Sequence, residues 1–107
     1  FMRRIARVMR VRDGKLDEYR QLHAAVWPEV LEALRRSGIR DYTIYHRKGL
    51  LFSAMVYVGD DYAVDRARLL ADPAMQRWNV LTGPCLEPVE GPDGEPWPTM
   101  DELFHMD

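Results

Sequence analysis

Three stretches of the chain predict β-strands, and in the first two of them apolar residues alternate with charged or polar ones, a period of two. The first is Arg3 to Val11, which ends at the turn signal Asp13-Gly14. The second and third, Asp41 to Arg47 and Leu50 to Val58, are joined by Lys48-Gly49 and so predict a hairpin. The third stretch is apolar on both faces, which is typical of a strand that is covered on both sides.

Apolar residues at spacings of three and four predict helices between these strands. One helical region runs from Lys15 to Arg36 and is broken at Pro28, with Gly38 as a left-handed cap at its end. A second helical region follows the hairpin, with one helix over Tyr62 to Ala71 and another from Pro73 to Leu81.

The end of the chain predicts a long loop and a short last strand. Five of the seven prolines lie between Pro84 and Pro98, so we expect a loop there that could act as a lid. Met100 to Met106 is the expected last strand.

The order strand, helix, strand, strand, helix, strand predicts an α+β fold, the ferredoxin-like split βαβ (βαββαβ) domain, as a single domain over residues 2–107. Because so few helices can cover only one face of the sheet, we expect a homodimer whose two sheets pack into a dimeric α+β barrel.

Composition narrows the class of protein. The 107 residues are 47% hydrophobic and 30% charged, which is ordinary for a soluble globular domain. The single Cys85 excludes an intrachain disulfide and offers no structural zinc site. A net charge of −2 and the lack of a long apolar run predict neither nucleic-acid binding nor a membrane span, and we expect a cytoplasmic protein. The one basic concentration is interpreted as a solvated face or rim; it comprises Arg3, Arg4, Arg7, Arg10 and Arg12.

The stretch from Tyr19 to Val30 contains His23, a histidine at the point where the helix pattern must stop. Steps of three and four place His23 on the inward face of a helix, together with Leu16, Tyr19, Val26 and Val30. Pro28 must end that helix and pushes Trp27 toward an extended conformation. His23 is therefore expected in the last helical turn, beside a bend, either as a core or capping residue or as part of a site.

No phosphate-binding glycine loop, nucleophile elbow or paired cysteine motif is present. What remains are aromatic residues on several elements: Tyr19, Trp27, Tyr42 and Trp78. Each of these can simply pack the core, but aromatic faces with a few polar tips also hold small polar molecules such as sugars. From the residues alone we expect a dimer with an aromatic pocket that contains His23.

Four stretches in this order resemble the L-rhamnose mutarotase family: Y-R-Q-L-H-A-A-V-W-P-E-V, D-Y-T-I-Y, D-P-A-M-Q-R-W with L-T-G-P, and M-D-E-L-F-H-M-D. The resemblance implies a homodimer that interconverts the α and β anomers of L-rhamnose, or a related 6-deoxy sugar, without a cofactor or metal. It implies that His23 is the catalytic proton donor and that Tyr19, Tyr42 and Trp78 bind the sugar. The family often has a second tryptophan at the next position, where this chain has Asn79, so an amide replaces a stacking surface.

The implied chemistry needs one proton delivered to the ring oxygen and another removed from the anomeric hydroxyl. Histidine, with a usual pKa of about 6.5, suits the acid. Tyr19 and Tyr42 are better hydrogen-bond partners than bases, which leaves a water or a carboxylate from the hairpin as the base. Trp97, in the proline-rich loop, is expected either in a lid or at a dimer contact.

Two other functions fit the same architecture, because a fold alone does not choose among them. One is a cofactor-free or haem-linked monooxygenase, and the other is a sugar-binding dimer without catalytic activity. The ordered match of several stretches favours the mutarotase over both.

Overall fold

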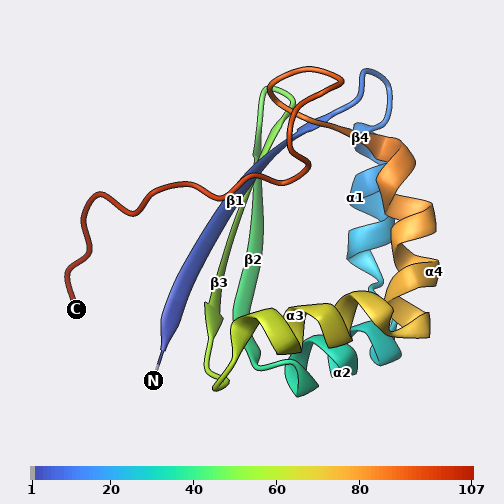
Figure 1. Ribbon diagram of the computed structural model, residues 1–107. Helices are drawn as coiled ribbons and strands as arrows, with labels where there is room; N and C mark the ends of the chain where they lie inside the picture. Colours follow the sequence, from blue (N-terminus) through green and yellow to red (C-terminus); the bar gives the residue numbers. More distant parts are fainter. Residues whose placement is uncertain (1) are drawn as a thin grey trace.

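The computed structural model describes residues 2–107 and has the predicted order of elements (Figure 1). The elements are β1 (Arg3–Val11), α1 (Leu16–Ala24), α2 (Pro28–Arg36), β2 (Ile39–Arg47), β3 (Leu50–Tyr57), α3 (Tyr62–Ala71), α4 (Pro73–Thr82), the 3₁₀ turn η1 (Gly83–Cys85) and β4 (Leu86–Glu87). This is the βαββαβ order of a ferredoxin-like α+β fold, with each helical crossover divided in two by a proline.

The four strands form one antiparallel sheet in the order β2-β3-β1-β4. The hairpin between β2 and β3 turns at Lys48 and Gly49, whose φ angles of 49° and 82° fit a two-residue turn with both central residues left-handed. Near its start, β2 carries a bulge at the positive-φ residue Asp41, which shifts the pairing between Arg40 and Thr43. The bulge redirects the side chains that follow it on β2.

The prediction of a last strand over Met100 to Met106 is wrong. The fourth strand is the two-residue β4, and after a loop the chain returns to the free edge of β1, where the Met100 N–H donates to Ala6 O at 2.8 Å. Thr99 makes only an isolated bridge with Arg7. Pro96 and Pro98 lack the N–H groups that a longer ladder would need, so pairing stops after one bridge.

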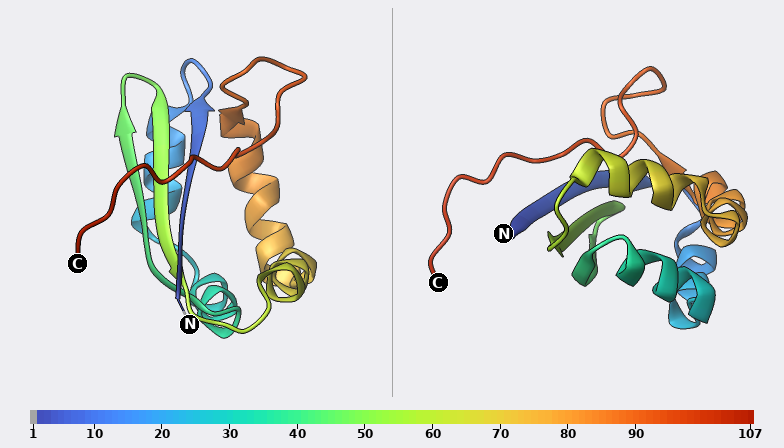
Figure 2. Two further views of the ribbon diagram at one scale, coloured as in Figure 1. Left: turned by 60° about the vertical axis from the view of Figure 1, so that its left-hand side comes forward. Right: turned by 60° about the horizontal axis from the view of Figure 1, so that its bottom comes forward.

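All four helices lie on one face of the sheet, as Figures 1 and 2 show from three directions. The core lies between them and the inward side chains of the strands, among which Met9, Leu51 and Tyr57 are buried. None of the helices within residues 2–107 is long and apolar enough to cross a membrane.

The opposite face of the sheet is not covered by helices. Tyr45 on this face is 61% exposed. The chain end crosses toward it and is tied down by an ion pair of 2.7 Å between Arg4 Nε and Glu102 Oε1. Beyond that pair the tail extends away from the body (Figure 2), and its large apolar side chains are exposed: Leu103, Phe104 and Met106.

Local sequence signals explain where the helices begin and end. Asp72 caps α4 by accepting hydrogen bonds from the Ala74 and Met75 N–H groups, and Pro73 takes the first helical position. Gly38 follows the end of α2 with a left-handed φ of +83°. A side chain at this position would be crowded, because its Cβ would stand 3.0 Å from Tyr57 Cε1. These signals orient α4 so that Trp78 faces inward.

Candidate active site

His23 is placed by the break between α1 and α2. Helix α1 ends at Ala24, Trp27 is extended with φ −63° and ψ 139°, and Pro28 opens α2, as predicted. The His23 Nδ1 atom lies 3.0 Å from the Tyr19 carbonyl oxygen. Because a carbonyl can only accept, Nδ1 carries the hydrogen of this bond. The other ring nitrogen, Nε2, is therefore the atom that can exchange a proton with a bound molecule.

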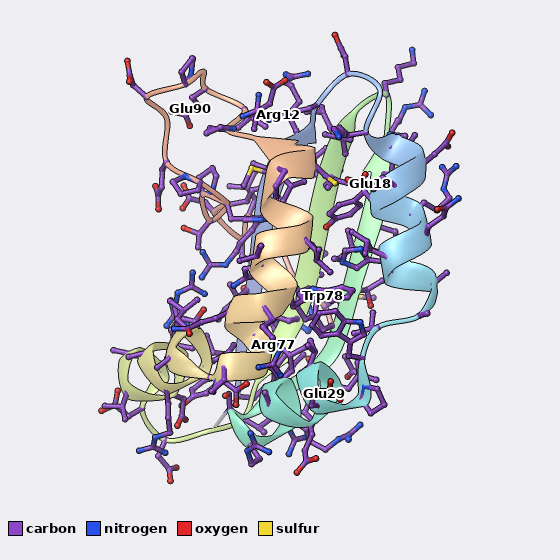
Figure 3. The ribbon with its side chains drawn as sticks, turned by 90° about the vertical axis from the view of Figure 1, so that its right-hand side faces the viewer. Arg12, Glu18, Glu29, Arg77, Trp78 and Glu90 are labelled. Atoms are coloured by element: carbon purple, nitrogen blue, oxygen red, sulfur yellow. The ribbon has the colours of Figure 1, made fainter. Side chains whose placement is uncertain are left out.

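Aromatic rings surround the imidazole on two sides. The Tyr19 ring centroid lies 4.2 Å from that of His23, and the Trp78 ring meets His23 edge-on at 5.3 Å. Trp27 supports Trp78 from behind with a second edge-on contact at 5.2 Å. Figure 3 shows Trp78 on the side of α4 that faces α1. These contacts restrict the rotation of the imidazole and hold it at the wall of a cavity.

All five site residues predicted from the sequence line this cavity, which has a volume of about 440 Å³. We call it the aromatic chamber. Its walls come from α1, the bulged strand β2 and α4, and the predicted residues in them are Tyr19, His23, Tyr42, Trp78 and Asn79. A chamber of this size accommodates a monosaccharide.

The polar tips of the aromatic residues are free to bind a ligand. Among residues 2–107, no hydrogen-bond partner is found for the Tyr19 or Tyr42 hydroxyl or for the Trp78 indole N–H. Tyr19 and Trp78 are nevertheless only 5% and 6% exposed. Neither the Tyr19 hydroxyl nor the Trp78 N–H is among the buried unpaired atoms of residues 2–107, so both reach the open space of the chamber, where they can hydrogen-bond to a polar ligand.

Both tyrosines stay protonated at neutral pH. Burial raises the pKa of the Tyr19 phenol and, against the opposing charges of Arg7 and Arg66, also that of Tyr42. The Tyr42 side chain is 44% exposed because much of its surface faces the open cavity, yet protein atoms surround it closely enough to desolvate the hydroxyl. The two phenols are therefore suited to hydrogen bonding and not to removing a proton.

A second chamber adjoins the first and was not predicted. It has a volume of about 390 Å³, and its charged walls are Arg7 on β1 and Arg66 on α3, so we call it the arginine chamber. The two chambers share wall residues, among them Tyr42, Asn79 and Trp97. The interpretation of Arg7 as part of a solvated basic face is wrong, since it lies on the helix side of the sheet and is half-buried.

Trp97 lies against its own chain's cavity and forms part of both chambers. Its carbonyl oxygen accepts a hydrogen bond of 3.0 Å from Arg7 Nη1. Pro96 lines the arginine chamber beside it. The end of the proline-rich loop thus closes one side of the site within the same chain.

Within residues 2–107, no group of three or more His, Cys, Asp or Glu side chains could hold a metal ion.

The arrangement defines a ferredoxin-like α+β protein with a divided cavity, in which one histidine can exchange protons among unpaired hydroxyl and indole groups. A family model for L-rhamnose mutarotase matches residues 4–106. The chain therefore belongs to the L-rhamnose mutarotase family, whose members are isomerases.

Individual relatives agree with this family. An L-rhamnose mutarotase from Burkholderia orbicola (strain MC0-3) is 36% identical, covering 99% of this chain and 100% of the relative. Another from Phocaeicola vulgatus (strain ATCC 8482) is 34% identical, again covering 99% of this chain and 100% of the relative.

Solved structures show the same fold at lower identity. A crystal structure of an L-rhamnose mutarotase from Formosa agariphila superimposes with a TM-score of 0.77 at 21% identity, covering 98% of this chain and 99% of that one. A tetracenomycin F2 cyclase from Streptomyces glaucescens follows with a TM-score of 0.70 at 18% identity, covering 98% and 97% of the two chains. The fold is thus shared by proteins of different activity, and family membership, not the fold, favours the mutarotase over the monooxygenase.

Proposed function

We propose that the protein interconverts the α and β anomers of L-rhamnose, or of a related 6-deoxy sugar, with the pyranose bound in the aromatic chamber. The observation that supports this proposal best is the His23 imidazole, whose Nδ1 is engaged by the Tyr19 carbonyl and whose Nε2 is left for the sugar. The hydroxyls of Tyr19 and Tyr42 and the Trp78 indole N–H supply the hydrogen bonds that position the ring.

In this mechanism His23 delivers the first proton. Protonated Nε2 donates to the ring oxygen while the bond between that oxygen and C1 breaks and the C1 hydroxyl becomes an aldehyde carbonyl. The open chain rotates about C1–C2, and the ring closes on the other face of the carbonyl, which returns the proton to Nε2.

The proton of the anomeric hydroxyl leaves to water in this proposal. Among the described residues, no carboxylate lines the aromatic chamber. The hairpin carboxylate considered above, Asp41, lines a groove on the other face of the sheet. A water that bridges the anomeric hydroxyl and a chamber hydroxyl can accept this proton and return it on closure.

Magnetisation-transfer NMR on an equilibrium mixture of L-rhamnose anomers tests the activity. We expect wild-type protein to accelerate anomer exchange and His23→Asn to lower the rate constant by a factor on the order of 10² to 10⁴, since that is the contribution of a placed general acid. His105→Asn is the matched control, because His105 lies on the tail, outside the chamber wall, with its Nε2 2.8 Å from Asp107 Oδ1. Full activity in a folded His23→Asn protein would show that another group donates the proton. If wild-type protein does not accelerate anomer exchange, the proposed function is wrong.

A homodimer completes the proposed assembly. The sheet face without helices carries exposed aromatic surface at Tyr45, and the tail beside it exposes Leu103 and Phe104. A second copy packed sheet to sheet would remove this apolar surface from water. Sedimentation equilibrium should give twice the chain mass, and a monomer at all concentrations would contradict this assembly.

The cytoplasmic location expected from the sequence stays a prediction that cell fractionation can test.

A further inference from the structure

Trp97 reaches the cavity from a loop, whereas the other aromatic residues of the site lie on helices or strands. Its side chain is half-buried and lines the aromatic chamber together with His23 and Trp78. It also lines the arginine chamber, and it packs against the core cluster that contains Met9 and Tyr19. The indole therefore belongs to the same cavity wall as the proposed proton donor, although the proposed mechanism gives it no part.

The backbone of Trp97 has an unfavourable conformation. Its φ angle is +50°, in the left-handed region that residues other than glycine, asparagine and aspartate seldom adopt. Gly91, in the same loop, has a φ angle of +97°, so the loop contains glycine at one position of positive φ and tryptophan at another. Strained residues of this kind persist only where their surroundings hold them, and they are concentrated at sites that clamp a ligand. The strain therefore points to a use for the indole itself.

Contacts with β1 hold Trp97 in this conformation. The Val8 N–H donates to Pro98 O at 3.2 Å, which ties the next residue of the loop to the edge of the strand. The carbonyl oxygen of Trp97 itself accepts a hydrogen bond of 3.0 Å from Arg7 Nη1. The position of the indole thus depends directly on the guanidinium of Arg7.

Arg7 joins the loop to α3. Its Nη2 donates to the Tyr62 hydroxyl at 2.8 Å, and the Tyr62 ring is held in turn by an edge-on contact with Tyr57 at 5.1 Å. Among residues 2–107, no carboxylate oxygen lies within 4.0 Å of Arg7, and its Nε is sealed from solvent without a hydrogen-bond partner. A buried N–H without a partner lowers stability, so neither an ion pair nor favourable burial explains this arginine. Its two hydrogen bonds, which fix Trp97 against α3, do explain it.

We propose that Trp97 is a further sugar-binding residue and that Arg7 is a positioning residue, which holds the Trp97 indole against the bound sugar. This inference rests on the proposed function and adds to it a contact from the loop. L-rhamnose presents C–H groups and a methyl group that the face of an indole can cover. The indole would contact the sugar before, during and after ring opening, so it should affect binding more than the chemical step.

Substitutions at Trp97 test the contact. Magnetisation-transfer NMR at several concentrations of L-rhamnose gives KM and kcat, and calorimetry gives Kd. Trp97→Ala should raise KM and Kd by about three- to tenfold and change kcat less than about twofold, the effect of losing one stacking surface. Trp97→Leu keeps an apolar side chain at the position and gives the same test if the alanine variant does not fold. A Kd that is unchanged in the folded variants, as judged by circular dichroism, would overturn the proposal.

A double-mutant cycle tests the positioning role of Arg7. Arg7→Met should raise KM and Kd by about threefold or more in the otherwise wild-type protein, but by less than about 1.5-fold when Trp97→Ala is already present. Arg7→Lys keeps the charge but not the planar fork, so it should behave alike, and it replaces Arg7→Met if that variant does not fold. Arg20→Met is the matched control, because Arg20 is exposed on α1 and lies outside both chamber walls. Equal losses of affinity in the two backgrounds would show that Arg7 does not act through Trp97.

These measurements separate this inference from the proposed function. If wild-type protein binds L-rhamnose without accelerating anomer exchange, the proposed function fails, and Kd alone then decides the roles of Trp97 and Arg7. If exchange is accelerated and the substitutions leave Kd and KM unchanged, only this inference fails. Wild-type protein that does not bind L-rhamnose would overturn both.

Discussion

The two chambers of the cavity use their wall residues in different ways. In the aromatic chamber the residues that face the ligand also pack the protein: Trp78 is buried against Val30 and Met75, and Tyr19 is buried against Met9. In the arginine chamber Arg7 and Arg66 contribute charge but no counter-charge meets them within residues 2–107. The aromatic chamber thus takes its ligand-facing groups from residues that pack the core, whereas the arginine chamber adds two half-buried charges to a wall that is otherwise largely apolar.

The largest expected effect separates the chambers by stability. Trp78→Ala should lower the free energy of unfolding by about 3–5 kcal/mol, because it removes a large buried ring and leaves a cavity. Arg66→Met should change it by less than about 1 kcal/mol or raise it, since a half-buried unpaired charge is replaced by an apolar chain. Urea unfolding followed by circular dichroism measures both values. Equal losses of unfolding free energy in the two variants would contradict this difference between the chambers.

A smaller effect should appear at alkaline pH, from the Tyr19 phenol of the aromatic chamber and the Cys85 thiol of the same core cluster. Burial raises the pKa of the Tyr19 phenol, and burial followed by the hydrogen bond to Glu18 raises that of the neighbouring Cys85 thiol from 9.0 to about 11. The folded state therefore keeps protons that the unfolded state releases. The stability from both groups is complete below the unfolded pKa values and is lost as the pH rises through the folded ones.

Urea midpoints measured at intervals from neutral to strongly alkaline pH test this expectation. The midpoint should fall above about pH 9 in wild type, where the unfolded thiol begins to ionise. The decline should be shallower in Tyr19→Phe and in Cys85→Ala. A wild-type midpoint that is constant over this range would contradict the assignment of buried, protonated groups.

The smallest effect concerns Asn79, which belongs to both chambers. Asn79→Trp supplies the stacking surface that the family often has, and a stacked pair contributes about 0.5–1.5 kcal/mol. We expect KM for L-rhamnose to fall by about two- to tenfold with kcat unchanged, because the ring binds substrate and transition state alike. A KM for L-rhamnose that is unchanged or higher in a folded Asn79→Trp protein would contradict this expectation.

Most of the fold was predictable because the signals that determine it are local. The break at Pro28, the left-handed Gly38 and the Lys48-Gly49 hairpin depend on residues next to one another, and all three predictions are confirmed. The last strand was misplaced for a reason of another kind. A two-residue strand such as β4 is too short to show alternation, and its pairing depends on the distant edge of β1.

Site residues with a distinctive chemistry could be predicted from the sequence. Residues that enter the site only because the fold buries them could not. His23 and the aromatic residues stand out in the sequence, and they line one chamber as expected. Arg7 lies in a strand in which arginines alternate with apolar residues, so pattern alone assigned it to the solvated face. Only the packing of α3 across the sheet reveals that Arg7 and Arg66 share a cavity.

The tryptophans give the protein a built-in optical probe. The chain has three: Trp78 and Trp97 line the cavity, and Trp27 contacts the Trp78 ring. All indole emission therefore originates at or directly behind the walls that a ligand would touch. Entry of a sugar should change the intensity or wavelength of that emission, so occupancy can be followed in unlabelled protein even with molecules that are bound but never converted.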